Sequence, residues 1–236
     1  MNEIVVINHS TVVSEAQLLA ALPNFQTQVD RDFFPVWGTR AKLRHEAPGY
    51  VPKPGEAVLA VLDNADQAGA LGYHDRTPHG DPIGKVFCKT TIQAGASWTV
   101  CFSHELLEML ADPWVMCCAQ VGARFYAQEV CDAVEDDSLG YHIGTTLVSD
   151  FVKPTWFLPS VATVAGGRSF GGHVTQALEL AKGGYISYFA NGSWHEVDNF
   201  RSAPPDKHSR QRRREAATPR PLGAFARLRA LLTKSK

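Results

Sequence analysis

The sequence lacks the features that mark a secreted or membrane-spanning chain. Its first segment, MNEIVVINHSTVVSEAQLLAAL, has no basic start, no continuous apolar core and no small-residue cleavage site, so it does not predict a signal peptide. No apolar run approaches the roughly 20 residues that a membrane-spanning helix requires. We therefore expect a cytoplasmic protein without a transmembrane segment. No internal repeat is present either.

Cysteines are few, and their spacing excludes one class of site. The chain has five, an odd number, and no two of them form a C-x-x-C pair. This pattern argues against a cysteine-rich zinc site and favours reduced thiols that pack as small buried residues. Cys131 lies between Glu129 and Asp132 and could serve as a soft metal ligand, although burial as a small apolar residue is the simpler expectation.

Net charge is close to zero, but the charge is unevenly distributed. The whole chain carries −1, whereas residues 201–236 hold eleven Lys and Arg against two acidic residues, a net charge of +9 that leaves −10 for residues 1–200. We therefore expect one folded domain over 1–200 and a basic, flexible tail over 201–236. The tail ends in LGAFARLRALL, which predicts a short amphipathic helix. It is either a solvated extension or an anchor for an acidic partner, protein or nucleic acid.

Local patterns predict an α+β domain with a small mixed sheet. Buried strands are expected at 3–8, 55–64 and 84–91, and NG at 191–192 predicts the turn of a β-hairpin over 183–197. Residues 14–33 predict a helix that Ser14 caps and that Pro23 breaks or kinks. The Gly- and Pro-rich stretch at 65–83 reads as a loop. Residues 123–134 mix helical and strand character.

The chemically informative segment is SWTVCFSHELLEMLADP, residues 97–113, which predicts a helix over about 98–111 that Ser97 caps and Pro113 ends. His104 and Glu108 are four residues apart, so they lie on one helix face about 6 Å apart along the axis and can reach one metal ion. Glu105 projects about 100° away and can approach a water bound to that metal as a general base. Glutamate is an acceptable zinc ligand in place of the more common second histidine.

A zinc site needs further protein ligands, and the acidic segment QEVCDAVEDD supplies candidates. Glu129 lies 21 positions after Glu108, a separation typical of metallopeptidases whose third ligand is a glutamate on a following helix. Asp132 could accept the other ring N–H of His104 and so orient that ligand. The roles of Glu129 and Asp132 could be exchanged, because the sequence alone does not decide between them. Asp112 lies too far along the helix to share the ion, and its charge opposes the helix dipole there, so we expect it to have a compensating partner.

The two segments SHELLEMLADP and EVCDAVED resemble the paired motifs H-E-x-x-E…P and E-[IV]-x-D-x-x-E of phosphate-induced (exordium-like) plant proteins. They also look like segments of uncharacterised bacterial and phage-encoded proteins. Both groups resemble divergent zincins of the glutamate-ligand (gluzincin-like) kind. The resemblance is specific over about 98–157, weaker over TQVDRDFFPVWG and GYHDRTPHGDPIGKV, and does not cover the tail.

The resemblance implies a zincin-like fold and a zinc-dependent, peptidase-like hydrolase. His104 and Glu108 would be ligands, Glu129 or Asp132 a further ligand, and Glu105 the general base. The strand before the helix would be the sheet edge along which a peptide substrate lies. An aromatic or histidine side chain near the site could stabilise an oxyanion, with Tyr126, Tyr141 and His142 as candidates.

Two other interpretations stay open. In one, residues 98–111 form a plain amphipathic helix whose apolar side chains pack inward while the acids face water. In the other, the metal only staples the core of a non-catalytic structural or assembly protein, virion-associated if phage-encoded, and the basic tail docks on a partner. His74 and His79 are expected to be solvated turn residues. The acidic run 135–137 could bind Ca²⁺, but a solvated loop is the simpler expectation.

Overall fold

The computed structural model describes residues 1–67 and 69–199, and the expected basic tail with its amphipathic helix lies outside them. The described part of the chain is mixed α+β, as expected, but it contains three sheets rather than one small mixed sheet, together with a few helices. The strands are β1 Glu3–Asn8, β2 Lys42–Glu46, β3 Ala57–Leu62, β4 Gly72–Arg76, β5 Pro82–Phe87, β6 Cys118–Val121, β7 Arg124–Ala127, β8 Tyr141–Ile143, β9 Thr146–Val148, β10 Tyr185–Ala190 and β11 Ser193–Asp198. The α-helices are α1 Glu15–Thr27, α2 Phe34–Trp37, α3 Cys88–Gln93 and α4 Trp98–Ala111.

The main sheet has five strands in the order β2-β1-β3-β5-β4. Its first four strands are parallel to one another, and β4 pairs antiparallel with β5 at the edge. Both faces of β1 are covered, because Ile4 and Val6 belong to the main core while Val5 and Ile7 pack in a smaller cluster on the opposite face. The apolar run at 3–8 therefore predicted a two-sided buried strand correctly.

Two expectations about this sheet were wrong. The expected strand 84–91 ends at Phe87, and helix α3 begins at Cys88, so β5 is an interior strand rather than the sheet edge. The edge strand is β4, which lies within the segment 65–83 that was expected to be a loop. An antiparallel edge strand is specified by pairing with its neighbour rather than by local hydrophobic alternation, and that pairing is not visible in sequence.

Helix α1 starts as predicted and continues further than predicted. Ser14 forms a capping box with Gln17. Pro23 lies inside α1 and does not break it; the chain continues through a π-helical segment, Gln28–Phe33, into α2. An interior proline costs about 3 kcal/mol, but the fully buried Leu18 and Phe25 pack into the main core on either side of the expected break. Tertiary packing therefore outweighs the local preference.

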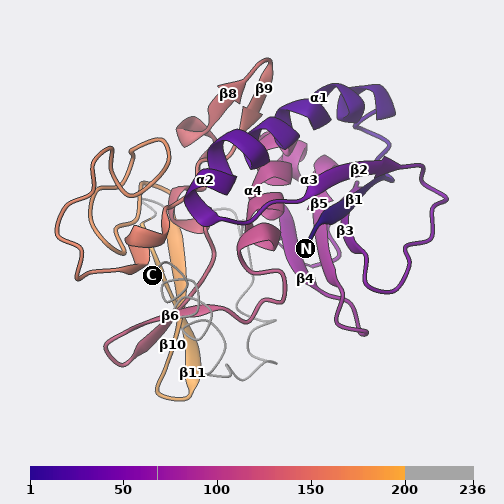
Figure 1. Cartoon of the computed structure of the whole chain (residues 1–236). Helices are drawn as coiled ribbons and strands as arrows, with labels where there is room; N and C mark the ends of the chain where they lie inside the picture. Colours follow the sequence, from indigo (N-terminus) through magenta and orange to yellow (C-terminus); the bar gives the residue numbers. More distant parts are fainter. Residues whose placement is uncertain (68, 200–236) are drawn as a thin grey trace, which may run out of the picture.

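Helix α4 is enclosed on nearly all sides. It contacts β4 and β5 on one side and β9 on another (Figure 1). Every residue from Val100 to Leu110 is buried. The N-terminal residue Ser97 has the extended backbone of an N-cap, but its hydroxyl contacts Thr99, and Asp137 accepts a hydrogen bond from the Ser97 amide at 2.6 Å. Acidic Asp137 thus complements the positive end of the helix dipole.

The remaining sheets are antiparallel. One has the order β11-β10-β7-β6, and β8 and β9 form a two-stranded hairpin. The predicted hairpin over 183–197 is confirmed, and Asn191 and Gly192 have the positive φ values, 51° and 82°, that its tight turn requires. Short 3-10 helices occupy Asp132–Val134, Asp137–Leu139 and Pro154–Phe157. Segment 123–134, which sequence left ambiguous, therefore contains strand β7 and a 3-10 turn.

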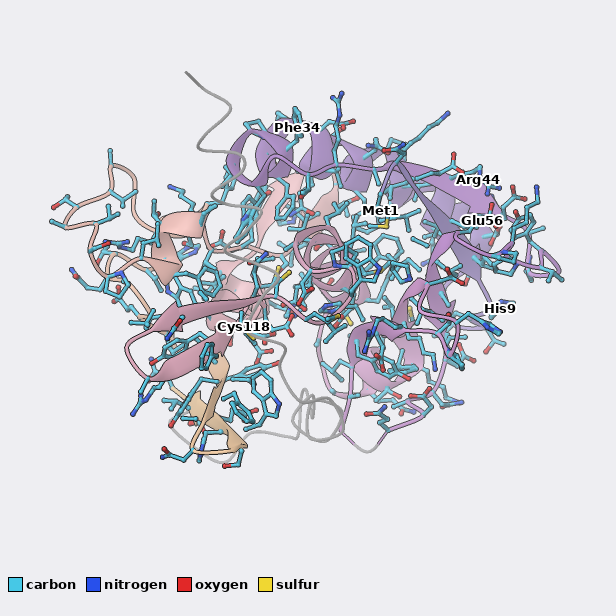
Figure 2. The ribbon with its side chains drawn as sticks, turned by 60° about the horizontal axis from the view of Figure 1, so that its bottom comes forward. Met1, His9, Phe34, Arg44, Glu56 and Cys118 are labelled. Carbon is cyan, nitrogen blue, oxygen red and sulfur yellow. The ribbon has the colours of Figure 1, made fainter. Side chains whose placement is uncertain are left out.

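A charged network closes the loop after β2. The guanidinium of Arg44 contacts carboxylates of Glu3, Glu46 and Glu56, and the Arg44–Glu56 pair lies together at the sheet end in Figure 2. Such partly exposed ion pairs tether loops more than they stabilise the fold. Within residues 1–67 and 69–199, no helix combines the length and apolar character needed to cross a membrane.

Candidate metal centre

Helix α4 carries three ionisable side chains into the protein interior. His104 is 2% exposed, and Glu105 and Glu108 are fully buried. The interpretation in which the acids of this helix face water is therefore wrong. Because burying an uncompensated charge is costly, these side chains need close partners of opposite charge.

The chain segment after β7 lies against α4 and brings two more carboxylates to it. The Gln128 side chain donates to the carbonyl of Ala111 at the end of α4, and the Cys131 amide donates to Glu108 Oε1 at 3.3 Å. Glu129 and Asp132, at either end of this segment, are 4% and 2% exposed. Glu129 was expected on a following helix, but it lies between β7 and the 3-10 turn that starts at Asp132. The expected proximity exists, but hydrogen bonds between side chains and backbone, rather than a helix, hold this segment against α4.

One group of possible metal ligands is His104, Glu108 and Asp132. His104 Nε2 lies 3.2 Å from Glu108 Oε1 and 3.2 Å from Asp132 Oδ1. Both carboxylates therefore face the same ring nitrogen. The sequence left open whether Glu129 or Asp132 is the ligand beside His104, and the geometry favours Asp132. One ligand atom from each of these three residues lies within 4.8 Å of the other two.

A second group contains a histidine that sequence reasoning assigned to a solvated turn. His74 is in strand β4 and is 2% exposed, so that assignment was wrong. Its Nδ1 lies 3.5 Å from Glu108 Oε2 and 3.9 Å from Glu105 Oε2, and its Nε2 lies 3.7 Å from Glu129 Oε2. His74, Glu108 and Glu129 also offer three ligand atoms within 4.8 Å of one another.

The alternation of β4 explains how His74 reaches this cluster. Tyr73 points to a separate apolar cluster, where its hydroxyl bonds Asp66 and Lys85, so Gly72 and His74 face α4. A Cβ on Gly72 would lie 2.9 Å from the Glu105 side chain. The missing side chain therefore lets the edge strand approach the helix. In the sequence, only the spacing of Gly72 and His74, two residues apart and so on one face of a strand, indicated this arrangement.

Burial and charge act in opposite directions on His104. Burial alone lowers the pKa of His104, but the negative charge of Glu108 and hydrogen bonding with Asp132 and Glu108 raise that pKa well above its usual 6.5. The surrounding carboxylates thus favour positive charge at this position. A divalent metal ion would supply that positive charge and require neutral imidazole ligands.

The donor set fits a borderline metal such as zinc. Imidazole nitrogens and carboxylate oxygens are both accepted zinc ligands. Thiols are not part of the set: burial raises the pKa of Cys131 well above its usual range, which keeps the sulfur protonated and apolar. The residues therefore fit zinc or a similar divalent ion through two histidines and several carboxylates.

Asp112 ends helix α4 with the partners it was expected to need. It is fully buried, and its two carboxylate oxygens accept from the amides of Met116 and Cys117 at 3.0 and 2.8 Å. These amides offset the unfavourable dipole at the helix C-terminus and fold the chain back towards β6. Asp112 belongs to neither ligand group in the described residues.

Other residues considered from sequence lie away from the cluster or have structural partners. Tyr141 donates to Asp32 at 3.0 Å, Tyr126 contacts Tyr188, and His142 is exposed. His79 is exposed, as expected. The acidic run 135–137 is not simply solvated, since it begins with a buried glutamate and ends at the N-terminus of α4.

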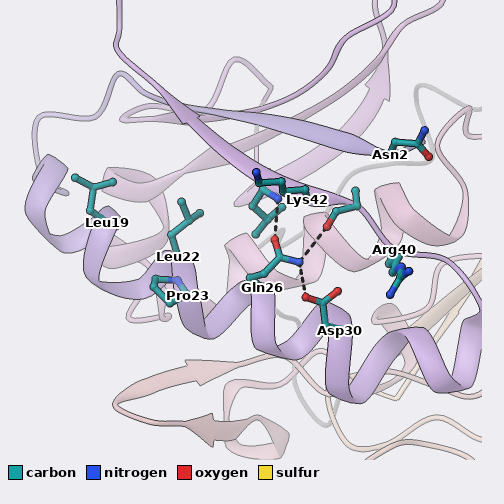
Figure 3. Close-up of a pocket in the computed structure, with 10 residues that line it drawn as sticks. Asn2, Leu19, Leu22, Pro23, Gln26, Asp30, Arg40 and Lys42 are labelled. Carbon is teal, nitrogen blue, oxygen red and sulfur yellow. Dashed lines mark hydrogen bonds between the residues drawn. The ribbon is translucent and has the colours of Figure 1, made fainter.

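A surface pocket of about 700 Å³ lies between α1 and β2 (Figure 3). In it Gln26 accepts from the Leu43 amide at 2.8 Å and donates to Asp30 and to the carbonyl of Ala41. Strand β2 and strand β4 are at opposite ends of the main sheet, so the pocket is remote from His74 on β4. Its polar side chains fasten α1 to the sheet edge, and we assign it no chemistry.

Comparison with known proteins gives no independent assignment. No family model, no curated protein and no solved structure matches the chain. The geometry of the cluster and the H-E-x-x-E motif are therefore the basis for a functional proposal.

Proposed function

We propose that the chain is a zinc-dependent hydrolase of the peptidase type with a zincin-like arrangement. The supporting observation is a buried carboxylate, Glu105, that lies beside two groups of metal-ligating side chains and belongs to neither. A purely structural site has no use for an extra buried charge. A hydrolase uses such a group as a base.

The residues divide into binding and proton-transfer roles. His104, Glu108 and Asp132 would hold the metal on the α4 side of the cluster, where the His104 ring nitrogen faces both carboxylates. When bound, zinc polarises a substrate carbonyl and makes water more acidic. Glu105 accepts a proton from the attacking water on one of its carboxylate oxygens and returns it to the leaving nitrogen. Because two acidic ligands reduce the effective charge of zinc, we expect modest turnover.

The proposed substrate is an extended peptide. Strand β4 is the terminal strand of the main sheet, and it carries His74 next to Glu105. An extended chain can add to such an edge through main-chain hydrogen bonds. A peptide bound in this way would bring a backbone carbonyl towards the general base, whatever its side chains.

The decisive test is Glu105→Gln, which keeps the shape of the side chain and removes its basicity. Zinc content should be unchanged, while hydrolysis of a fluorogenic peptide library should fall by about 10²–10⁴-fold. Glu196→Gln, an exposed glutamate on β11, is the matched control and should keep full activity. Full activity in Glu105→Gln would rule this residue out as the base.

Burial favours a second candidate, a metal that staples the core of a non-catalytic assembly protein. The ligand candidates are 0–4% exposed, which is typical of closed structural sites. Under this candidate, the zinc-loaded protein hydrolyses no peptide faster than the metal-free protein does. Chelation would then lower the melting temperature and change nothing else.

A further inference from the structure

Glu108 lies between two histidines, and each of its oxygens faces a different one. Oε1 is 3.2 Å from His104 Nε2, and Oε2 is 3.5 Å from His74 Nδ1. Asp132 completes the first group and Glu129 the second, so the two groups have only Glu108 in common. This is the arrangement of a bridging carboxylate, with one set of donors on each side.

The positions of the donors support two ions rather than one. Each group supplies one histidine nitrogen, one oxygen of Glu108 and one further carboxylate, all buried. Zinc–ligand distances are about 2.0–2.2 Å. Ions in two-metal sites lie about 3.5–4 Å apart, a separation that one carboxylate can bridge through its two oxygens. His74 and His104 approach Glu108 through different oxygens, as two ions would require.

The net charge of the buried cluster gives an independent reason to expect two ions. Four carboxylates gather here at 0–4% exposure: Glu105, Glu108, Glu129 and Asp132. With both histidines neutral, as metal ligands must be, one divalent ion leaves a net charge of −2 in the interior. Two divalent ions bring the cluster to neutrality. A buried excess charge is strongly unfavourable, so the donor set favours the occupancy that balances it.

We propose that the cluster binds two divalent cations, one through His104 and Asp132 and the other through His74 and Glu129, with Glu108 bridging them. This inference rests on the proposed function for the first ion and adds the second. The mixed imidazole and carboxylate donors suit zinc, manganese, iron or cobalt better than calcium. His74 thereby acquires a ligand role at the Glu108 oxygen that His104 does not face.

The test is metal stoichiometry on the full chain, measured by titrating metal-free protein with Co²⁺ and by elemental analysis after zinc loading and desalting. We expect two equivalents in the wild type, one in His74→Ala, one in His104→Ala, and fewer than one in Glu108→Gln. His79→Ala, an exposed histidine in the turn after β4, is the matched control and should keep two. Circular dichroism confirms that each variant is folded.

A second measurement on the wild type avoids any dependence on variants. Electron paramagnetic resonance of Mn²⁺-loaded protein should give the exchange-coupled spectrum of a close pair, which an isolated ion does not give. One equivalent that disappears in both histidine variants, with an uncoupled Mn²⁺ spectrum, would overturn the two-ion proposal and leave a single-ion hydrolase. No bound metal in the wild type would overturn the proposed function as well.

Discussion

Removing the metal should destabilise the protein by an amount that the charge cluster determines. Ligand atoms of Glu108 lie within 4.8 Å of those of Asp132 and of Glu129. At an effective dielectric constant of about 20, each of these two pairs of unit negative charges repels by about 3.5 kcal/mol at that separation, or about 7 kcal/mol for both pairs together. A protonated His104 offsets part of the repulsion, so we expect chelation to lower the free energy of unfolding by about 4 kcal/mol. Bound metal at 1,000 times its Kd contributes a similar amount.

The assay is thermal unfolding with and without a chelator at pH 7.5. At about 2–4 °C per kcal/mol for a chain of this size, the melting temperature should fall by about 8–16 °C. Glu108→Gln removes the carboxylate that both repelling pairs share and keeps an acceptor for the Cys131 amide. In this variant the chelator should change the melting temperature by less than a quarter of the wild-type effect. An equal drop in both proteins, or no drop in wild type stripped of its metal, would refute the electrostatic reasoning.

Two further predictions concern packing and pH. Gly72→Ala places a Cβ 2.9 Å from Glu105, so we expect urea unfolding to show a loss of about 1–3 kcal/mol; Gly49→Ala, which meets open space, should change stability by less than about 0.5 kcal/mol. Equal losses would refute the close-approach argument. Hydrogen bonds, above all the one from the Ser10 hydroxyl, lower the pKa of Asp63 to about 2. The ionised carboxylate therefore stabilises the folded protein fully above its unfolded pKa of about 3.9, and this contribution is lost as the pH falls towards 2. The stability difference between wild type and Asp63→Asn should shrink from pH 5 to pH 2, and a constant difference would contradict this.

Sequence predicted the parts of the fold that local patterns specify. Helix 98–111 has the predicted bounds because its apolar residues are periodic and Pro113 cannot continue it. Strand β1 and strand β3 were predicted from short apolar runs, and the hairpin from the Asn191-Gly192 turn. His104, Glu105 and Glu108 share one helix, so their spacing alone predicted that two of them could bind one ion.

The rest depends on contacts between distant segments. Strand β4 contains Gly72 and Asp75, residue types that are depleted in strands, and it forms because it pairs with β5. His74 therefore could not be predicted to lie beside Glu129, 55 positions later. The choice between Glu129 and Asp132 as partner of His104 likewise depends on how segment 128–132 bends along α4. Pro23 shows the reverse case, in which core packing overrides a strong local signal.

Anomalous diffraction tests the central claim most directly. Crystals of zinc-loaded protein, measured above and below the zinc absorption edge, should give a strong difference peak between His104 Nε2 and the carboxylates of Glu108 and Asp132. A second peak beside His74 and Glu129 would establish the paired site. No anomalous peak within the cluster, with zinc found only at surface histidines or nowhere, would contradict the account and reduce the H-E-x-x-E helix to a buried ion-pair network.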